Sequence, residues 1–154
     1  KMINLFKITI LFFFIILASC GYKPIFSAKN SNFAITEIKF VGEKNIASKI
    51  GNNLKIYKNK KNKEQFYTLE IFSNKEKNIV SKDSKGNPII FETKISVDLT
   101  VLENGEVKNT KAIIKSFTYN NSSNKFSLKQ YEKDIENNLI SEIASTIILH
   151  LHSI

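Results

Sequence analysis

Apolar and polar residues alternate most regularly between positions 91 and 101. One face of this segment carries Phe91, Ile95, Val97, Leu99 and Val101, and the other carries Glu92, Lys94, Ser96 and Asp98. Such alternation is typical of a half-buried β-strand. Asn104-Gly105 follows, and this pair favours a two-residue type I′ turn because both central residues need positive φ. We therefore expect Val107 to Tyr119 to return as a paired strand.

Two further strands are expected before this hairpin. Phe33 to Val41 is rich in strand formers and stops at Gly42, and Gln65 to Phe72 alternates in polarity. After the polar segment 73–78 the second strand can resume through Ile79 and Val80. Turn residues 83–88 then close a long hairpin.

Helical periodicity appears twice. Ile46, Ile50 and Leu54 predict a helix of about three turns from Lys44 onward, which Gly51 weakens a little. Ser127 and Gln130 have the spacing of a capping box. The apolar residues of the long C-terminal helix then fall on one side: Leu128, Tyr131, Ile135, Leu139, Ile143, Ile147 and Leu151. The order β-α-β-β-β-α predicts an α+β two-layer fold, with about four strands in the sheet and two helices packed on one face.

The N-terminal residues predict export. A basic start precedes the short apolar segment 8–17, and Leu17-Ala18-Ser19-Cys20 resembles the bacterial lipobox. We interpret residues 1–19 as a lipoprotein signal peptide, 20–32 as a lipidated tether and 33–154 as one domain. Acylated Cys20 would anchor the protein to the membrane, and Gly21 in the position after it favours the outer membrane. The alternative is an ordinary signal peptide or an uncleaved anchor, with Cys20 incidental.

Charge narrows the class of partner. The formal net charge is +9, and every basic residue is a lysine. Without arginine, and after export, nucleic acid is not the expected partner. An anionic glycolipid at the outer membrane suits lysine better, because lysine acts as a point charge. The lysine- and asparagine-rich segment 58–63 is either a solvated loop or an anion-binding patch.

No residues suggest catalysis, a cofactor or a metal site. The sequence contains no Gly-rich phosphate loop, HExxH motif or G-x-S-x-G elbow. His150 and His152 point in different directions on a helix, so they cannot clamp one metal. Carboxylates such as Glu132, Asp134 and Glu136 are explained by a solvated helix face. We expect a protein that is not an enzyme.

The opening Cys20-Gly21-Tyr22-Lys23-Pro24-Ile25, the element order and the pattern around Asp83 to Phe91 resemble the lipopolysaccharide-assembly lipoproteins of the LptE family. This resemblance implies two helices on a four-stranded sheet and a non-catalytic role inside an outer-membrane β-barrel, LptD. There the protein would support barrel assembly and help deliver lipopolysaccharide. Family contact residues for lipopolysaccharide are basic, but no motif places them on particular lysines.

Two alternatives belong to other classes. A periplasmic ligand-binding or transporter-accessory lipoprotein would have a deep apolar pocket in its core. A structural lipoprotein that holds peptidoglycan would need a glycan-binding signature, which the sequence lacks.

A partner surface follows from the register of the 104–105 turn. A two-residue turn places Val97 opposite Ala112 and Ile95 opposite Ile114, so Ala112 and Ile114 would face the core. The opposite face would then carry the candidate partner surface, with two candidate anion-binding lysines beside it: Phe66, Phe72, Ile113, Phe117 and Tyr119, with Lys94 and Lys115. The alternative is a β-bulge in strand four that returns Phe117 and Tyr119 to the core.

Overall fold

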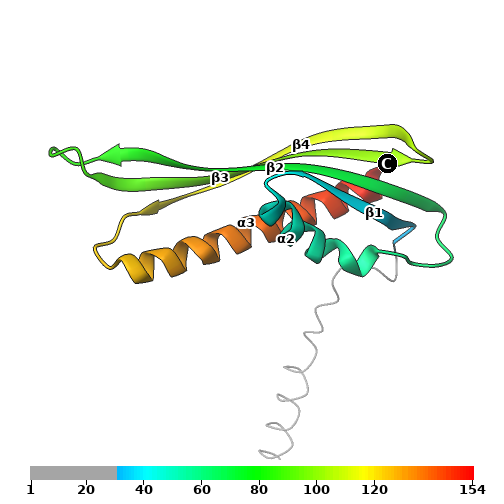
Figure 1. Ribbon diagram of the computed structural model, residues 1–154, viewed down its shortest axis with the longest axis horizontal. Helices are drawn as coiled ribbons and strands as arrows, with labels where there is room; N and C mark the ends of the chain where they lie inside the picture. The colour runs from blue at the N-terminus through cyan, green and yellow to red at the C-terminus, as the bar shows by residue number, and fades with distance from the viewer. Residues whose placement is uncertain (1–30) are drawn as a thin grey trace, which may run out of the picture.

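The computed structural model describes residues 31–154, which form a four-stranded sheet with two helices beneath one face (Figure 1). The elements are β1 (Phe33–Gly42), α2 (Lys44–Leu54), the 3-10 turn η1 (Lys55–Tyr57), β2 (Gln65–Lys82), β3 (Pro88–Glu103), β4 (Glu106–Asn120) and α3 (Lys125–Ser153). The strand order is β1-β2-β3-β4, with β1 parallel to β2 and the other pairs antiparallel. The predicted α+β two-layer fold is confirmed. The predicted signal peptide, Cys20 and residues 20–30 of the tether lie outside the described residues.

One continuous core lies between the sheet and the helices. α2 packs against β1 and β2, while α3 packs against β3, β4 and α2. The alternating residues of β3, from Ile95 to Val101, are all buried on the helix side, as the sequence predicts. Ile143 of α3 is completely buried and belongs to the same cluster. The apolar stripe of α3 therefore closes the core from below.

Gly51 allows α2 to approach β1 closely. A Cβ atom at this position would lie 2.6 Å from Cζ of Phe40, so the phenyl ring occupies the space that a side chain would need. The sequence marks this glycine only as a weak point in a helix. In the fold it is a packing position between α2 and β1.

β2 is longer than its polarity pattern predicts. The polar segment 73–78 does not interrupt it, because β3 pairs with it along the whole length, from Tyr67↔Glu103 to Lys82↔Pro88. The resulting β2–β3 hairpin projects to the left in Figure 1. At its tip the Asp83 carboxylate accepts hydrogen bonds from the backbone N–H groups of Lys85 (2.9 Å) and Asn87 (2.8 Å). These bonds lower the pKa of Asp83, and the Asn87 side chain makes the largest contribution.

The 104–105 turn forms as predicted, but the register beyond it differs. Asn104 and Gly105 both have positive φ, at 54° and 87°. The pairs Glu103↔Glu106 and Leu102↔Val107 follow the expected register, and then a bulge at Lys108 moves every later pair by one residue. Val97 therefore faces Ile113 instead of Ala112. Because side chains alternate, the bulge exchanges the two faces of β4.

The N-terminus of α3 also differs from the prediction. The N-cap is Asn124, whose side-chain oxygen accepts a hydrogen bond from the backbone N–H of Ser127 at 3.0 Å. Ser127 is therefore the third helical residue and not the cap. Gln130 donates to Asp134 at 3.2 Å, so the proposed capping box is wrong. Asparagine is as good an N-cap as serine, so the spacing from Ser127 to Gln130 was not decisive.

Candidate functional site

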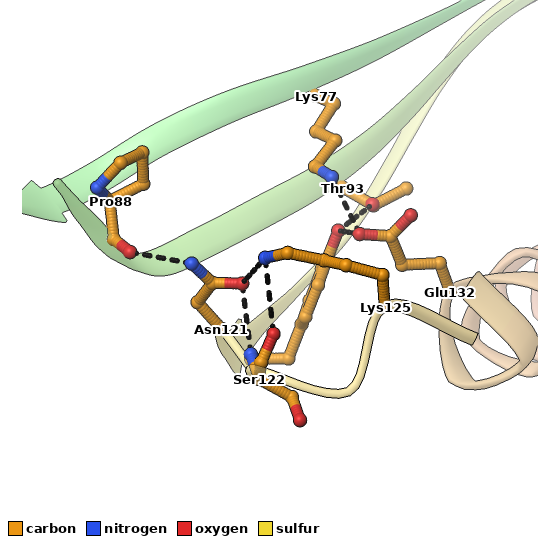
Figure 2. A network of polar contacts seen from close by, with 8 residues as sticks. Lys77, Pro88, Thr93, Asn121, Ser122, Lys125 and Glu132 are labelled. Carbon is orange, nitrogen blue, oxygen red and sulfur yellow. Dashed lines mark hydrogen bonds and ion pairs between the residues drawn. The ribbon is translucent and has the colours of Figure 1, made fainter. Parts of the chain in front are cut away.

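The connection between β4 and α3 is fastened to the start of β3 by polar contacts (Figure 2). The Asn121 side-chain amide donates to the Pro88 carbonyl at 2.7 Å, and its oxygen accepts from the Lys125 ammonium at 3.2 Å. Lys125 also donates to the Ser122 carbonyl at 3.1 Å. The Asn121 backbone N–H donates to the Ile89 carbonyl at 2.8 Å and so extends the pairing of β3 and β4. These bonds fix where α3 begins relative to the long hairpin.

Glu132 of α3 joins the first turns of the helix to the sheet. Its carboxylate accepts a hydrogen bond from the Tyr119 hydroxyl at 2.9 Å. It also pairs with the Lys77 ammonium at 2.6 Å (Figure 2). Burial alone would raise the pKa of Glu132, but the bonds from Lys77 and Tyr119 lower it below its ordinary value. Lys77 also lies over the Phe91 ring, 4.1 Å from its centre. One carboxylate thus holds β2, β4 and α3 together.

Glu136, one turn further along α3, is buried and binds two lysines. Its oxygens pair with Lys49 of α2 at 2.5 Å and with Lys75 of β2 at 2.6 Å. Burial raises the pKa of this carboxyl, but the two lysine hydrogen bonds more than offset that effect and lower it. The expectation of a solvated carboxylate is therefore wrong for Glu136. Its anion connects α2, α3 and the sheet.

Beside these two glutamates lies an open groove of about 520 Å³ between β2 and the first three turns of α3. We call it the distal groove, and it is lined by Lys75, Phe126, Lys129, Gln130, Glu132, Lys133 and Glu136. Phe126 is 82% exposed. Within residues 31–154, neither Lys129 nor Lys133 forms an ion pair.

The distal groove has an excess of positive charge. Its two glutamates are already paired, Glu132 with Lys77, and Glu136 with Lys49 and Lys75. Lys129 and Lys133 add two cations to the rim. The site can therefore attract an anionic group to its lysines while an apolar group lies against Phe126 and the lysine stems.

The predicted partner surface is divided between two faces of the sheet. Ile113 and Tyr119 are 4% exposed and belong to the core, whereas Ile114, predicted to be buried, is 63% exposed. Phe117 also lies on the helix side, where it lines a small groove against α3. Lys115 is on that side too, paired with Glu142 at 3.4 Å. The Lys108 bulge is the physical reason for this correction, and it is the alternative that the sequence allowed.

Three of the predicted residues remain on the face away from the helices. Phe66 and Phe72 of β2 are each 45% exposed there. Lys94 of β3 lies on the same face and pairs with Glu76 of the neighbouring strand at 3.0 Å. Their role as a contact surface stays a prediction.

Sequence reasoning missed the residues of the distal groove, although signals for them exist. Lys129 and Lys133 are four residues apart and therefore share one side of the helix, with Phe126 one turn before them. Lys75 continues the alternating series of β2 residues that face the core, where a charged side chain needs a partner. A cation at a core-facing strand position indicates a buried anion across from it, and Glu136 is that anion.

The two histidines lie apart from this groove. The His150 ring nitrogen Nε2 is 3.1 Å from the Asn109 side-chain oxygen, and burial with nearby Lys111 lowers the pKa of His150. His152 packs edge-on against the Phe33 ring at 5.0 Å. In the part of the chain that the structure describes, no group of histidine and acidic side chains could hold a metal ion. Among residues 31–154, no helix has the length and apolar character that crossing a membrane requires.

No family model matches this sequence, and no curated protein matches it significantly. Solved structures of bacterial lipoproteins are similar in fold. Rare lipoprotein B from Shewanella oneidensis gives a TM-score of 0.59 at 13% identity, over 77% of this chain and 95% of that chain. A minor lipoprotein from Acinetobacter baumannii gives 0.58 at 10% identity, over 77% and 90%. Lipoprotein B from Nitrosomonas europaea gives 0.56 at 13% identity, over 83% and 90%. These likenesses establish the fold.

Proposed function

We propose that this protein is an outer-membrane lipoprotein that assists lipopolysaccharide transport and assembly, as the plug and assembly partner of an LptD-like β-barrel. The observation that carries the proposal is the distal groove, where Lys129 and Lys133, which form no ion pair within residues 31–154, lie beside the exposed Phe126 ring. Lipopolysaccharide presents the matching chemistry, with anionic phosphates beside acyl chains. The shared lipoprotein fold and the lipobox ending at Cys20 support the compartment. In this role the protein binds and positions, and it does no catalysis.

The geometry favours an amphiphile over a small soluble anion. The groove is open, and its lysines line it together with the Phe126 ring, most of which is exposed to water in the free protein. An anionic headgroup with an attached chain satisfies both features at once, because the ammonium groups bind the charge while Phe126 covers apolar surface.

The groove is tested by lipopolysaccharide binding to the full chain in detergent. Lys129→Glu combined with Lys133→Glu should weaken binding by about tenfold or more, because each reversal replaces an attraction with a repulsion. The matched control is Lys82→Glu with Lys85→Glu, two exposed lysines at the tip of the β2–β3 hairpin. It changes the net charge equally. An equal loss in both double variants would show that only overall charge matters and would contradict the groove.

The barrel and the anchor need separate measurements. Affinity purification of the tagged protein from solubilised membranes should recover an outer-membrane β-barrel. Cys20→Ser should release the domain from the membrane or leave an unprocessed precursor, with unchanged thermal unfolding. Recovery of the protein without any barrel, or mass spectrometry that finds Cys20 unmodified, would argue against this assignment.

A further inference from the structure

β4 is a long edge strand. It extends over 15 residues at one side of the sheet, and within residues 31–154 no strand pairs with its outer side. Its outward backbone N–H and C=O groups are therefore available for pairing. Proteins usually blunt such an edge with a bulge or with charged residues, and β4 has both, so an added strand must provide partners for its lysines.

A small groove lies directly beside this edge. It has a volume of about 150 Å³ and is lined by Phe117 of β4 and by six residues of α3, of which Tyr131, Ile135 and Leu139 are apolar or aromatic and Asp134, Asn138 and Glu142 are polar. Phe117 and Tyr131 are 45% and 47% exposed. An apolar side chain that projects from a strand added to β4 would enter this space and cover both rings.

The side chains of β4 that face the helix layer alternate between cationic and apolar. Between Asn109 and Tyr119, which face the same side, they are Lys111, Ile113, Lys115 and Phe117 in order. Lys115 pairs with Glu142 at 3.4 Å, but both groups are exposed, so this bond is weak and Lys115 can turn to another carboxylate.

A second copy of β4 would offer these lysines almost no acidic partner. The only acidic residue of β4 is Glu106, at its first position. Antiparallel pairing of two β4 strands about Ile113 would set Lys111 of each copy opposite Lys115 of the other. Like charges directly opposite each other destabilise a strand pair.

We propose that β4 accepts an extended segment of a partner protein as a fifth strand, with acidic and apolar side chains alternating on its helix-facing side. The acidic side chains would lie opposite Lys111 and Lys115, and the apolar ones opposite Ile113 and Phe117. Backbone pairing supplies affinity, while the two lysines and the small groove supply specificity. This surface lies on the other flank of α3 from the distal groove, so it does not depend on lipid binding.

A synthetic peptide tests the proposal on the full chain in detergent. The blocked peptide Phe-Thr-Glu-Thr-Ile-Thr-Glu places its helix-facing residues opposite Phe117, Lys115, Ile113 and Lys111 in antiparallel order. Its control carries lysine in place of both glutamates. In NMR titrations the acidic peptide should shift the amide signals of β4. It should bind roughly tenfold or more tightly than the control, because two attractive cross-strand pairs become repulsive.

Charge-reversed variants of the protein distinguish recognition of charge from nonspecific binding of the peptide. Lys111→Glu with Lys115→Glu should reverse the preference between the two peptides while thermal unfolding changes little. If that variant folds poorly, Lys111→Gln with Lys115→Gln should bind both peptides equally.

Backbone methylation distinguishes an added strand from a segment that only fills the groove. N-methylation of alternate peptide residues should abolish binding in one frame and leave it intact in the other, because only every second N–H faces β4. Equal affinity of both peptides, equal effects of both methylation frames, or signal shifts confined to the distal groove would each overturn the proposal. A dimer in sedimentation that the acidic peptide dissociates would instead assign the edge to a second copy and would also overturn it.

Discussion

Replacing Glu136 with glutamine tests whether the buried carboxylate is the main polar connection between the two helices and the sheet. The Glu136 side chain is 12% exposed and binds Lys49 and Lys75 through separate oxygens. Glutamine has the same shape but no charge, and its NH₂ group cannot accept a hydrogen bond. One lysine therefore loses its acceptor, and the other keeps only a neutral one.

The expected loss follows from these contacts. A hydrogen bond that involves a charged group contributes about 1.5 to 3 kcal/mol. The two lysines are partly exposed, so water replaces part of what they lose. We therefore expect Glu136→Gln to lower the free energy of unfolding by about 2 kcal/mol at neutral pH. For a domain of this size that corresponds to a fall in Tm of roughly 5 to 8 °C.

Acid titration gives a second, independent readout. The folded-state pKa of Glu136 lies below its ordinary value of 4.5, so its contribution is complete above that pH. The contribution is lost as the pH falls through the folded-state pKa, because protonation breaks both ion pairs. Wild-type stability should therefore decline below about pH 4.5, and Glu136→Gln should reduce that decline. Glu132, whose pKa is also lowered, should account for part of the acid-induced loss of stability that remains in Glu136→Gln.

Glu142→Gln is the matched control, since it makes the same chemical change on the same helix. Glu142 is 58% exposed and its bond to Lys115 is 3.4 Å long. Loss of such a surface pair costs about 0 to 1 kcal/mol. Chemical denaturation of the wild type and both variants between acid and neutral pH measures all of these effects. Equal destabilisation by both substitutions, or an unchanged acid profile in Glu136→Gln, would refute the argument.

Three further substitutions, two of them with a matched control, test how α3 is capped and packed. Ile143→Asp should unfold the domain, because it places an uncompensated carboxylate at a completely buried position, whereas Leu149→Asp at a half-exposed position should leave a cooperative melt. Asn124→Ala should lower the free energy of unfolding, measured by chemical denaturation, by about 1 kcal/mol. Ser127→Ala should lower it much less, since only the Asn124 side chain caps the helix. Phe117→Lys should lower the free energy of unfolding by about 1 kcal/mol, because roughly half of the ring is buried. A wild-type melt for Ile143→Asp, equal losses at the two cap positions, or complete unfolding by Phe117→Lys would contradict these assignments.

The sequence predicts the elements well where local pattern and packing agree. The alternation of β3 and the glycine after Asn104 both specify conformations that the structure contains. The local pattern does not predict the length of β2, because its polar middle is extended only through pairing with β3. The start of α3 depends on which of several polar residues caps it, and Asn124 and Ser127 are both acceptable caps by type.

The candidate site was harder to predict because it is built from long-range pairs. Glu136 and Lys75 are distant in sequence, and the residues around each one do not identify the other as its partner. A polar residue on a helix is normally exposed to solvent. The sequence alone therefore does not distinguish a buried glutamate that two lysines bind from a solvent-exposed glutamate. The signal that could have revealed it is the lysine on the core-facing parity of β2.

The bulge at Lys108 determines most of what the surface of β4 can do. Without it, Ile113, Phe117 and Tyr119 would face away from the helices and form the aromatic surface that the turn register predicts. With it, Tyr119 reaches Glu132 and helps fix α3, while Phe117 borders a groove beside the free edge. Lys108 itself pairs with Glu103 at 2.9 Å and lies near the Tyr67 ring, which gives the extra residue a place on the helix side. One inserted residue thus moves Ile113 and Tyr119 into the core and Phe117 to the groove beside the sheet edge, where contact by an added strand is the favoured mode of binding.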